Sequence, residues 1–328
     1  MGEFDLIERF FKRPAAVAST GAVLGIGDDC ALLQPTPGMQ LAVSSDMLVE
    51  GRHFLSTVNP AHLGHKALAV NLSDLAACGA RPLAFTLALS LPRVDEPWLA
   101  GFSRGMWALA DAHGCELVGG DTTQGPLNIC ITVFGEVPAG QALLRSGARP
   151  GDDIFVSGTL GDARLALEAL LGHITLDADT LARARQRLER PSPRVALGLQ
   201  LRGVASSAMD VSDGLLGDLG HILKASGVGA CIDIEATSKL IASSAYPSSA
   251  SGQFDLEMTR QCTLAGGDDY ELVFTAPPSR RDAVAAASQA SGTAVTRIGT
   301  VSAEPGLRLV DAQGQPVAHR YASFDHFK

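Results

Sequence analysis

The chain has 328 residues, of which 46% are apolar, and its 26 Lys and Arg against 35 Asp and Glu give a formal net charge of −9. This length predicts roughly two domains with a sizeable core, and the apolar content excludes a disordered chain. The excess of acid argues against a nucleic-acid partner held by phosphate neutralisation. It is also unfavourable for phosphorylated substrates unless metal cations accompany them.

The N-terminus, MGEFDLIERFFKRP, is acidic and lacks an uninterrupted apolar stretch, so we expect no secretory signal. Phe4, Ile7 and Phe11 fall at helical spacing before Pro14, which predicts a short amphipathic helix packed on the body of the protein. No segment has about 18 uncharged apolar residues, so we expect no membrane span. The 6 cysteines form no C-x-x-C or zinc spacing, which indicates reduced thiols and a cytoplasmic protein.

Strands and helices are interleaved in the first half of the chain. Pro60 suits a first helical turn and Gly79 a helix end, which predicts a helix over residues 60–79. The pattern also predicts a helix at 95–114 and strands at 39–48, 82–91, 115–123 and 127–138, with the third strand running into a glycine turn. We therefore expect an α/β or α+β fold.

A loop-rich break, SGARPGDDIFVSG, separates the two halves. It predicts a boundary near residue 148 and domains at 1–148 and 149–328. After it, we expect helices at 160–172, 178–189, 213–227 and 279–291 and a further helix after PSPR. We also expect a strand directly after the break and strands at 206–212, 230–235, 296–301 and 306–310. The Ser-rich residues 236–255 are predicted to be a surface loop, and GGDDYEL a glycine turn that leads into a strand.

Several common catalytic patterns are absent from the sequence. It contains no P-loop, no protein-kinase motif set, no G-x-S-x-G and no H-E-x-x-H. The run Gly25–Asp29 is not a dinucleotide fingerprint, because acidic residues follow its second glycine and would repel a pyrophosphate.

Aspartates recur beside glycine or serine at the predicted ends of apolar strands. The instances are Asp28 and Asp29, Ser44 to Asp46, Asp74, Gly120 and Asp121, Asp210 to Asp213, and Asp268 and Asp269. Each alone has an ordinary explanation: Asp74 is a solvated helix residue, Asp213 a helix cap, and Asp28 with Asp29 a turn. Together they indicate hard cations, because clustered carboxylates raise one another's pKa and all-oxygen ligands select Mg²⁺ or Ca²⁺. Several such ions in one site indicate a polyphosphate, so the ligand that we predict is a magnesium-bound nucleotide.

The segments that carry these aspartates resemble the thiamine-monophosphate kinase family of the PurM-like superfamily, which is named for aminoimidazole ribonucleotide synthetase. The similarity covers nearly the whole chain. It runs through GEFDLIERFF, LGIGDDCALL, SSDMLVEGRHF, KALAVNLSDLAACGARP, LVGGDTTQGP, LLRSGARPGD, DVSDGLLGDLGHI, GGDDYEL and SFDHF.

The resemblance implies phosphorylation of thiamine monophosphate by ATP to thiamine diphosphate, the last step of that cofactor's biosynthesis. It implies a two-domain PurM-like fold and a homodimer in which N-terminal sheets form a barrel. It implies several Mg²⁺ ions on Asp29, Ser44, Ser45, Asp46, Asp74, Asp121, Asp210 and Asp213, ATP against Gly120, Asp121, Arg145 and Ser212, and thiamine phosphate against His53, Asp268 and Phe324. In two places the chain departs from the family pattern: Asp268 replaces the usual Glu and Ser45 a common Thr.

No general base is expected, because the acceptor phosphate has a second pKa near 6 and is largely ionised at neutral pH. We expect direct in-line transfer assisted by metal, with Asp46, Asp121 and Asp213 nearest the chemistry. Simpler explanations remain for three residues: a surface position for Arg145 and His53, and a core anchor for Phe324.

Two other functions stay open at this point. One is another superfamily ATP enzyme, acting on a purine intermediate, a selenium donor or a hydrogenase-maturation carbamoyl group. The other is a non-catalytic scaffold that binds nucleotide or metal. The selenium enzyme needs a reactive Cys or selenocysteine near its N-terminus, and the first cysteine here, Cys30, lies within the GDDC turn; the maturation protein needs a C-terminal cysteine, and this chain ends in Lys328.

Overall fold

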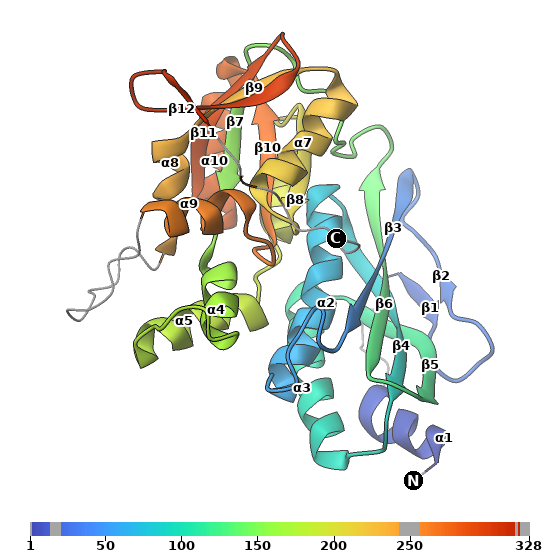
Figure 1. Ribbon diagram of the computed structural model, residues 1–328. Coiled ribbons are helices and arrows are strands. Elements are labelled where there is room, and N and C mark those ends of the chain that lie inside the picture. Colours follow the sequence, from blue (N-terminus) through green and yellow to red (C-terminus); the bar gives the residue numbers. More distant parts are fainter. Residues whose placement is uncertain (1, 14–20, 243–255, 319–320, 322–328) are drawn as a thin grey trace. The chain divides into compact units, whose positions relative to one another are not determined.

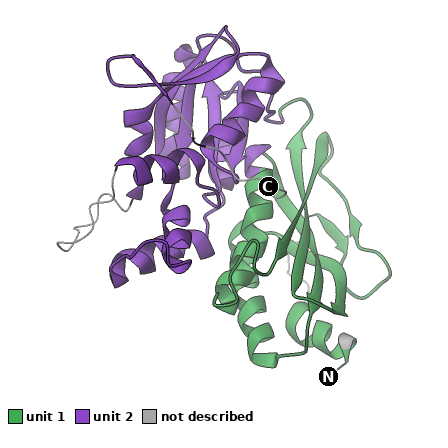
Figure 2. Cartoon of the chain, in the orientation of Figure 1, with its two compact units in different colours: residues 1–75, 80–141 green, residues 76–79, 142–328 purple. Residues whose placement is uncertain are grey.

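The computed structural model describes residues 2–13, 21–242, 256–318 and 321 (Figure 1). Two compact units make up the chain: residues 1–75 with 80–141 form unit 1, and residues 76–79 with 142–328 form unit 2 (Figure 2). Each unit combines a mostly antiparallel sheet with helices, which confirms the expected α+β class.

Unit 1 begins with a helix and a small hairpin. The helix has an α-helical start, α1 (Glu3–Leu6), and a π-helical continuation, Ile7–Phe11. The hairpin pairs β1 (Ala22–Leu24) with β2 (Leu32–Leu33) and was not expected from the sequence, since both strands are very short. The helix is confirmed, but its expected packing face is partly wrong: Phe4 is 83% exposed, whereas Leu6 and Phe10 are buried.

The sheet of unit 1 has the strand order β3-β6-β4-β5. Its strands are β3 (Met39–Val49), β4 (Arg81–Leu91), β5 (Glu116–Gln124) and β6 (Asn128–Pro138). The central strand β6 is antiparallel to both neighbours, and β4 is parallel to β5. Along β6, buried Ile129, Ile131 and Val133 alternate with half-buried residues, which is the period-2 pattern of a strand with one covered face.

Helices α2 (Pro60–Ala77) and α3 (Glu96–His113) pack closely against each other. A Cβ built on Gly64 would lie 2.0 Å from the Phe102 carbonyl oxygen, and one on Gly105 would lie 1.8 Å from that of Ala61. Asp95 caps the start of α3, and Gly114, with a φ of 57°, ends it. The contacts of α2 with β3, through Asn71 and Asp74, show that it covers one face of the sheet.

The glycine turn predicted at the end of β5 is wrong, because the strand continues through Gly119, Gly120 and Asp121. Gly120 has a φ of 146°, and a Cβ there would lie 1.9 Å from the Leu87 carbonyl oxygen. The glycine therefore permits close approach of β4 and β5 rather than a turn. Asp46 also lies inside its strand, so the expected strand-end positions of Asp46 and Asp121 are wrong.

Unit 2 has a seven-stranded sheet in the order β13-β12-β9-β11-β7-β10-β8. The strands are β7 (Asp153–Ser157), β8 (Ser207–Val211), β9 (Gly229–Asp233), β10 (Glu271–Ala276), β11 (Val295–Ser302), β12 (Gly306–Val310) and β13 (Pro316–Val317). Only the β9–β12 pairing within this described sheet is parallel.

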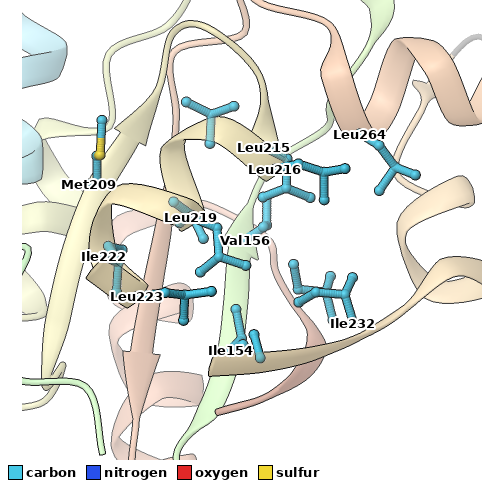
Figure 3. Packing of buried hydrophobic residues seen from close by; sticks show 14 of the residues in the cluster. Ile154, Val156, Met209, Leu215, Leu216, Leu219, Ile222, Leu223, Ile232 and Leu264 are labelled. Atoms are coloured by element: carbon cyan, nitrogen blue, oxygen red, sulfur yellow. The ribbon is translucent and has the colours of Figure 1, made fainter. Parts of the chain in front are cut away.

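Helices lie on both faces of this sheet. They are α4 (Asp162–Leu170), α5 (Ala178–Glu189), α6 (Val195–Gln200), α7 (Leu215–Ser226), α8 (Ile234–Ser238), α9 (Leu256–Ala265) and α10 (Arg281–Ser291), with a short 3₁₀ turn before α10. Figure 3 shows Leu219 and Leu223 of α7 in one buried cluster with Ile154 and Val156 of β7. On the other face, Asp153 pairs with Arg281 at the start of α10.

Two sequence-based predictions need correction near residues 236–265. The loop expected from residue 236 is wrong for 236–238, which belong to α8; Asp233 caps that helix by accepting from the Glu235 and Ala236 N–H groups. Residues 243–255 lie outside the described residues. Helix α9 was not predicted, because the polar LEMTRQCTLA has a weak helical pattern. No described helix combines the length and the apolarity needed to span a membrane.

Candidate functional site

A cavity of about 720 Å³ in unit 1 contains several of the predicted site residues. It brings together Asp29, Gly120 and Asp121, which are far apart in sequence, and adds Asp28. The remaining lining comes from the N-terminal helix, residues 26–31, β4 and β5. This volume is within the range of about 300–1,000 Å³ that small-molecule sites occupy.

The carboxylates of this cavity are exposed. Asp28 and Asp29 follow Gly27, and the Asp28 Oδ1 accepts the Asp29 N–H at 2.9 Å. Neither Asp29 nor Asp121 forms an ion pair with any residue within the described ranges. Gly119 and Gly120 leave the backbone of β5 uncovered by side chains beside Asp121. The arrangement offers oxygen ligands next to an accessible main chain, which suits a cation carrying a phosphate.

A second group of predicted residues lies where β3 meets α2. The Ser44 hydroxyl donates a hydrogen bond to the Asp74 carboxylate, and the Asp46 N–H donates to Asn71 Oδ1 at 3.1 Å. Asp46 and Asp74 are both half-buried. The structure therefore brings Ser44, Asp46 and Asp74 together on the helix-covered side of the sheet.

Ser45 does not join this group through its side chain. Its hydroxyl lies 3.0 Å from Thr132 Oγ1 and 3.2 Å from the Ile131 carbonyl oxygen of β6. Because neighbouring strand residues point to opposite faces, Ser45 lies on the other side of the sheet from Ser44. Only a main-chain atom of Ser45 is left to act beside Asp46.

His53 lies in a tight turn after β3. Its Nδ1 accepts the Val49 N–H at 3.0 Å, which assigns the proton of the neutral ring to Nε2. The Lys66 ammonium donates to the His53 carbonyl oxygen at 3.2 Å, and Lys66 is 2% exposed. This buried lysine of α2 holds the turn. Sequence reasoning missed Lys66 and Asn71, although both are polar residues in the apolar run KALAVNLSDLAA.

In unit 2, Asp210, Ser212 and Asp213 lie at the end of β8. Asp210 is 4% exposed and lies on the opposite face of the strand from Met209 and Val211, which pack in the core with α7. Ser212 and Asp213 are half-buried in the loop before α7.

Asp218 is a further acidic residue here, and sequence reasoning missed it. Its Oδ2 accepts the N–H groups of Ser212, Asp213 and Gly214 at 3.0 to 3.1 Å. Burial, and then the charge of Asp213, raises the pKa of Asp218 to about 7 despite these donors. The three main-chain N–H groups before α7, which could otherwise bind an anion, are thus occupied by the Asp218 carboxylate. The part of Ser212 that can still contact a ligand is its hydroxyl. An acidic residue in the first turn of α7 was the available signal.

The loop before β10 separates its two aspartates. Asp269 is 1% exposed and accepts the Gly161 N–H through both carboxylate oxygens, each at 3.0 Å. Burial raises the pKa of Asp269 well above its usual range. Asp268 is half-buried, and its N–H donates to the Ser212 carbonyl oxygen at 2.8 Å. Asp268 therefore lies beside Ser212.

The Asp268 loop is conformationally strained. Asp268 has a φ of 66° and Tyr270 a φ of 51°, in the left-handed region that most side chains avoid. The Tyr270 N–H bonds to the Val211 carbonyl oxygen at 2.9 Å. Such strain persists where surrounding bonds over-determine the backbone, and it is frequent at functional sites.

Within unit 2, Arg145 does not lie beside Ser212. The Arg145 carbonyl oxygen accepts from the Ser226 hydroxyl at 3.3 Å, at the C-terminal end of α7, whereas Ser212 precedes the N-terminal end. A 12-residue helix is about 18 Å long, so within unit 2 Arg145 is remote from Ser212. Phe324 lies outside the described residues.

The donor chemistry of these groups fits Mg²⁺. Carboxylate and hydroxyl oxygens predominate, as this hard cation requires. Among the residues that the structure describes, no three His, Cys, Asp or Glu side chains converge into a metal site on their own. The predicted ligands are divided between unit 1 and unit 2, and Mg²⁺ typically takes only one or two carboxylates per ion, with water and phosphate as its other ligands.

Comparison with known proteins gives the same assignment along the whole chain. Residues 27–137 match the family model of the AIR synthase related protein N-terminal domain, and residues 149–312 match that of the C-terminal domain. The thiamine-monophosphate kinase of Salmonella typhimurium is 47% identical over 328 residues, covering 99% of this chain and 98% of its own length.

Two solved structures extend the similarity to the fold. The thiamine-monophosphate kinase of Stenotrophomonas maltophilia K279a is 46% identical with a TM-score of 0.79, covering 90% of this chain and 92% of its own. AaThiL complexed with AMPPCP and TMP is 31% identical with a TM-score of 0.73, covering 89% of each chain. The chain therefore belongs to the thiamine-monophosphate kinase family of AIR-synthase-related proteins.

Proposed function

We propose that this chain transfers the γ-phosphoryl group of ATP to the phosphate of thiamine monophosphate, giving ADP and thiamine diphosphate. The observation that carries the proposal is the whole-length similarity to thiamine-monophosphate kinases at up to 47% identity among the relatives named above. The cavity that joins Asp29, Gly120 and Asp121 supports it, because it combines oxygen ligands with an open main chain.

Magnesium ions would be held by Asp29, Asp46, Asp74, Asp121, Asp210 and Asp213, with Ser44 and the main chain of Ser45 beside them. When bound, such ions offset the repulsion between the two polyanionic substrates. Two like charges about 4 Å apart repel by about 4 kcal/mol at an effective dielectric constant near 20. Asp46, Asp121 and Asp213 are the residues we place nearest the transferred group.

The remaining residues bind and orient the substrates in this proposal. Gly120 and Asp121 contact ATP in unit 1, and the Ser212 hydroxyl contacts it from unit 2. Arg145, which lies near the other end of α7 from Ser212, contacts a different part of the nucleotide. His53, held by Val49 and Lys66, presents Nε2 to thiamine phosphate. Asp268 and Phe324 complete the substrate contacts. Asp268 is one methylene shorter than the usual Glu, and its fixed backbone, bonded to Ser212, keeps it near Asp213.

The proposal includes no general base and no phosphorylated enzyme. The acceptor phosphate, with a second pKa near 6, is largely ionised at neutral pH, so no proton has to be removed. The oxygen of thiamine phosphate attacks the γ-phosphorus as the bond to the β-phosphate oxygen breaks. Incubation with ATP, Mg²⁺ and thiamine monophosphate should yield thiamine diphosphate; hydrolysis of ATP alone, or a stable phosphoprotein during turnover, would contradict this mechanism.

We also propose that the chain acts as a homodimer with domains at 1–148 and 149–328. The face of the unit 1 sheet opposite α2 exposes Leu41, Val43 and Met47 by 45%, 55% and 53%. An apolar sheet face of this kind is typical of a surface covered by another subunit. Light scattering should report a dimer, and Val43→Asp should yield monomers; a monomeric wild-type protein would refute the dimer.

We place the reaction in the cytoplasm. All six thiols, from Cys30 to Cys262, are free in the structure. Burial raises the pKa of the Cys262 thiol to about 12, which keeps it protonated and inert.

A further inference from the structure

The N-terminal helix has two apolar stripes with different surroundings. Leu6 and Phe10 are 2% and 9% exposed, and Trp107 Nε1 of α3 donates to the Phe10 carbonyl oxygen at 3.1 Å. Phe4, Ile7 and Phe11 form the second stripe, which lines the cavity of unit 1; Phe4 is 83% exposed, whereas Phe11 is 3% exposed and forms the back of the lining. The first stripe therefore anchors the helix, and the second faces the space beside Asp29 and Asp121.

Charged contacts hold the helix in this orientation. The Arg13 guanidinium donates to both oxygens of Asp111 at 2.9 and 3.0 Å and lies over the Trp107 ring, 4.1 Å from its centroid. Arg9 pairs with Glu96 at 2.7 Å. These contacts join the π-helical turn and the residues just after it to α3, so the cavity-facing stripe belongs to an anchored element.

The turn that carries Ile7 and Phe11 is π-helical. The Lys12 N–H donates to the Ile7 carbonyl oxygen at 2.9 Å, five residues earlier. Turns of this kind are rare and occur frequently at functional sites. Phe4, on the preceding turn, is 83% exposed although it borders an apolar cavity wall. A phenyl ring left this open contributes little to folding and is available to a ligand.

The cavity lining is of two chemical kinds. Asp28, Asp29 and Asp121 supply carboxylates and the glycines of β5 supply bare backbone, while the stripe and Val118 are apolar. A ligand that fills it needs a metal-bound anionic part and a flat apolar part. A nucleoside triphosphate with its cations has both, and aromatic side chains stack on a base whatever its hydrogen-bonding edge.

We infer that Phe4, Ile7 and Phe11 bind the purine base of ATP while its phosphates lie at Gly120 and Asp121. The inference rests on the proposed kinase function, which places ATP rather than thiamine phosphate at this strand. It makes the N-terminal helix part of the nucleotide site. Phe4 supplies the stacking surface, and Ile7 and Phe11 supply the wall.

The test compares Phe4→Ala and Ile7→Ala with the wild-type enzyme in steady-state kinetics. Loss of one stacked ring should raise the KM for ATP about tenfold in Phe4→Ala, with smaller effects in Ile7→Ala. The kcat and the KM for thiamine monophosphate should not change, and Phe4→Trp should restore the KM for ATP. Mg-tripolyphosphate, which has no base, should inhibit wild type and Phe4→Ala equally. Val94→Ala, at a 48% exposed apolar residue outside the cavity, is the matched control.

The inference is overturned if both variants keep the wild-type KM for ATP, if the KM for thiamine monophosphate rises instead, or if tripolyphosphate inhibition weakens in parallel. Direct calorimetric titration with ATP separates it from the kinase proposal. If wild type binds ATP but forms no thiamine diphosphate, the proposed function fails, and tenfold weaker ATP binding by Phe4→Ala still supports the base site. If wild type binds no ATP at all, both fail.

Discussion

The acidic residues of the unit 1 cavity differ from those inside unit 2. Asp29 and Asp121 are exposed and form no ion pair with any residue of the described segments. Glu271 is 0% exposed and pairs with Arg187 and Arg194. Asp153, 1% exposed, likewise pairs with two arginines, Arg281 and Arg297.

The difference follows from the cost of removing a charge from water. A buried carboxylate persists only if cations and hydrogen bonds replace its hydration, so each internal acid of this kind has fixed partners. An exposed carboxylate needs none and remains free to bind a cation that arrives with substrate. For these four acids, exposure and the presence of arginine partners, rather than residue type, separate the carboxylates of the cavity from those that hold the fold.

Replacing an aspartate proposed to bind Mg²⁺ should give the largest effect. Asp121→Asn and Asp46→Asn should each lower kcat at least 100-fold, because the charge that binds the cation is lost. Asp121→Asn should change the free energy of unfolding by less than about 0.5 kcal/mol, since its side chain is exposed. Thiamine diphosphate formation and urea unfolding measure the two quantities. The exposed Asp282→Asn is the control, and near-normal turnover in either test variant excludes it as a metal ligand.

Replacing a buried, paired acid should instead lower stability and leave substrate binding nearly unchanged. Glu271→Gln leaves Arg187 and Arg194 without their counter-charge and should lower the free energy of unfolding by about 3–5 kcal/mol. The KM values of the folded enzyme should remain near wild type. Glu304→Gln, at a side chain 85% exposed and paired with Arg308, should cost less than about 1 kcal/mol. Equal losses of unfolding free energy in Glu271→Gln and Glu304→Gln would contradict the difference between buried and exposed acids.

The two glycines beside Asp121 provide a backbone test within the cavity. Gly120→Ala places a Cβ 1.9 Å from the Leu87 carbonyl oxygen and should lower the free energy of unfolding by about 1–3 kcal/mol. A Cβ on Gly119 would meet its nearest neighbour, Thr86 Cγ2, at 3.9 Å, so Gly119→Ala should be tolerated. Thermal unfolding compares them, and a stable Gly120→Ala protein would show that β4 and β5 can separate there.

The pH dependence of stability gives the smallest expected effect. The hydrogen bond from Arg281, together with Arg297, lowers the pKa of Asp153 below its usual value. The stability that the ionised Asp153 carboxylate contributes is therefore fully present above its pKa in the unfolded chain, about 3.9. That stability is lost as pH falls through the lower pKa that Asp153 has in the folded protein. Asp153→Asn should lower Tm by a few degrees at pH 7, and the difference should shrink below about pH 4. If the Tm difference between wild type and Asp153→Asn did not change with pH, the destabilisation would come from altered packing and not from the lost charge.

Much of the fold could be predicted from local pattern. The expected strand at 39–48 and helices at 95–114 and 178–189 correspond to β3, α3 and α5, with ends within a residue or two. These elements carry strong signals: alternation or an apolar stripe, the caps Asp95 and Asp177, and a terminal Gly114. Helix α9 and the hairpin β1–β2 were missed, because their short or polar sequences form regular structure only against the rest of a unit.

The sequence by itself determined the family, the acidic segments and their chemistry, because these depend on residue type and order. Only the tertiary structure decided which residue of an adjacent acidic or serine pair has a side chain that can reach a ligand. Asp269 is buried on Gly161 while Asp268 lies beside Ser212, and Ser44 meets Asp74 while Ser45 faces away. The physical reason is that two adjacent residues of the same type differ only in the direction of their side chains. That direction is fixed by the packing of strands and helices that are distant in sequence.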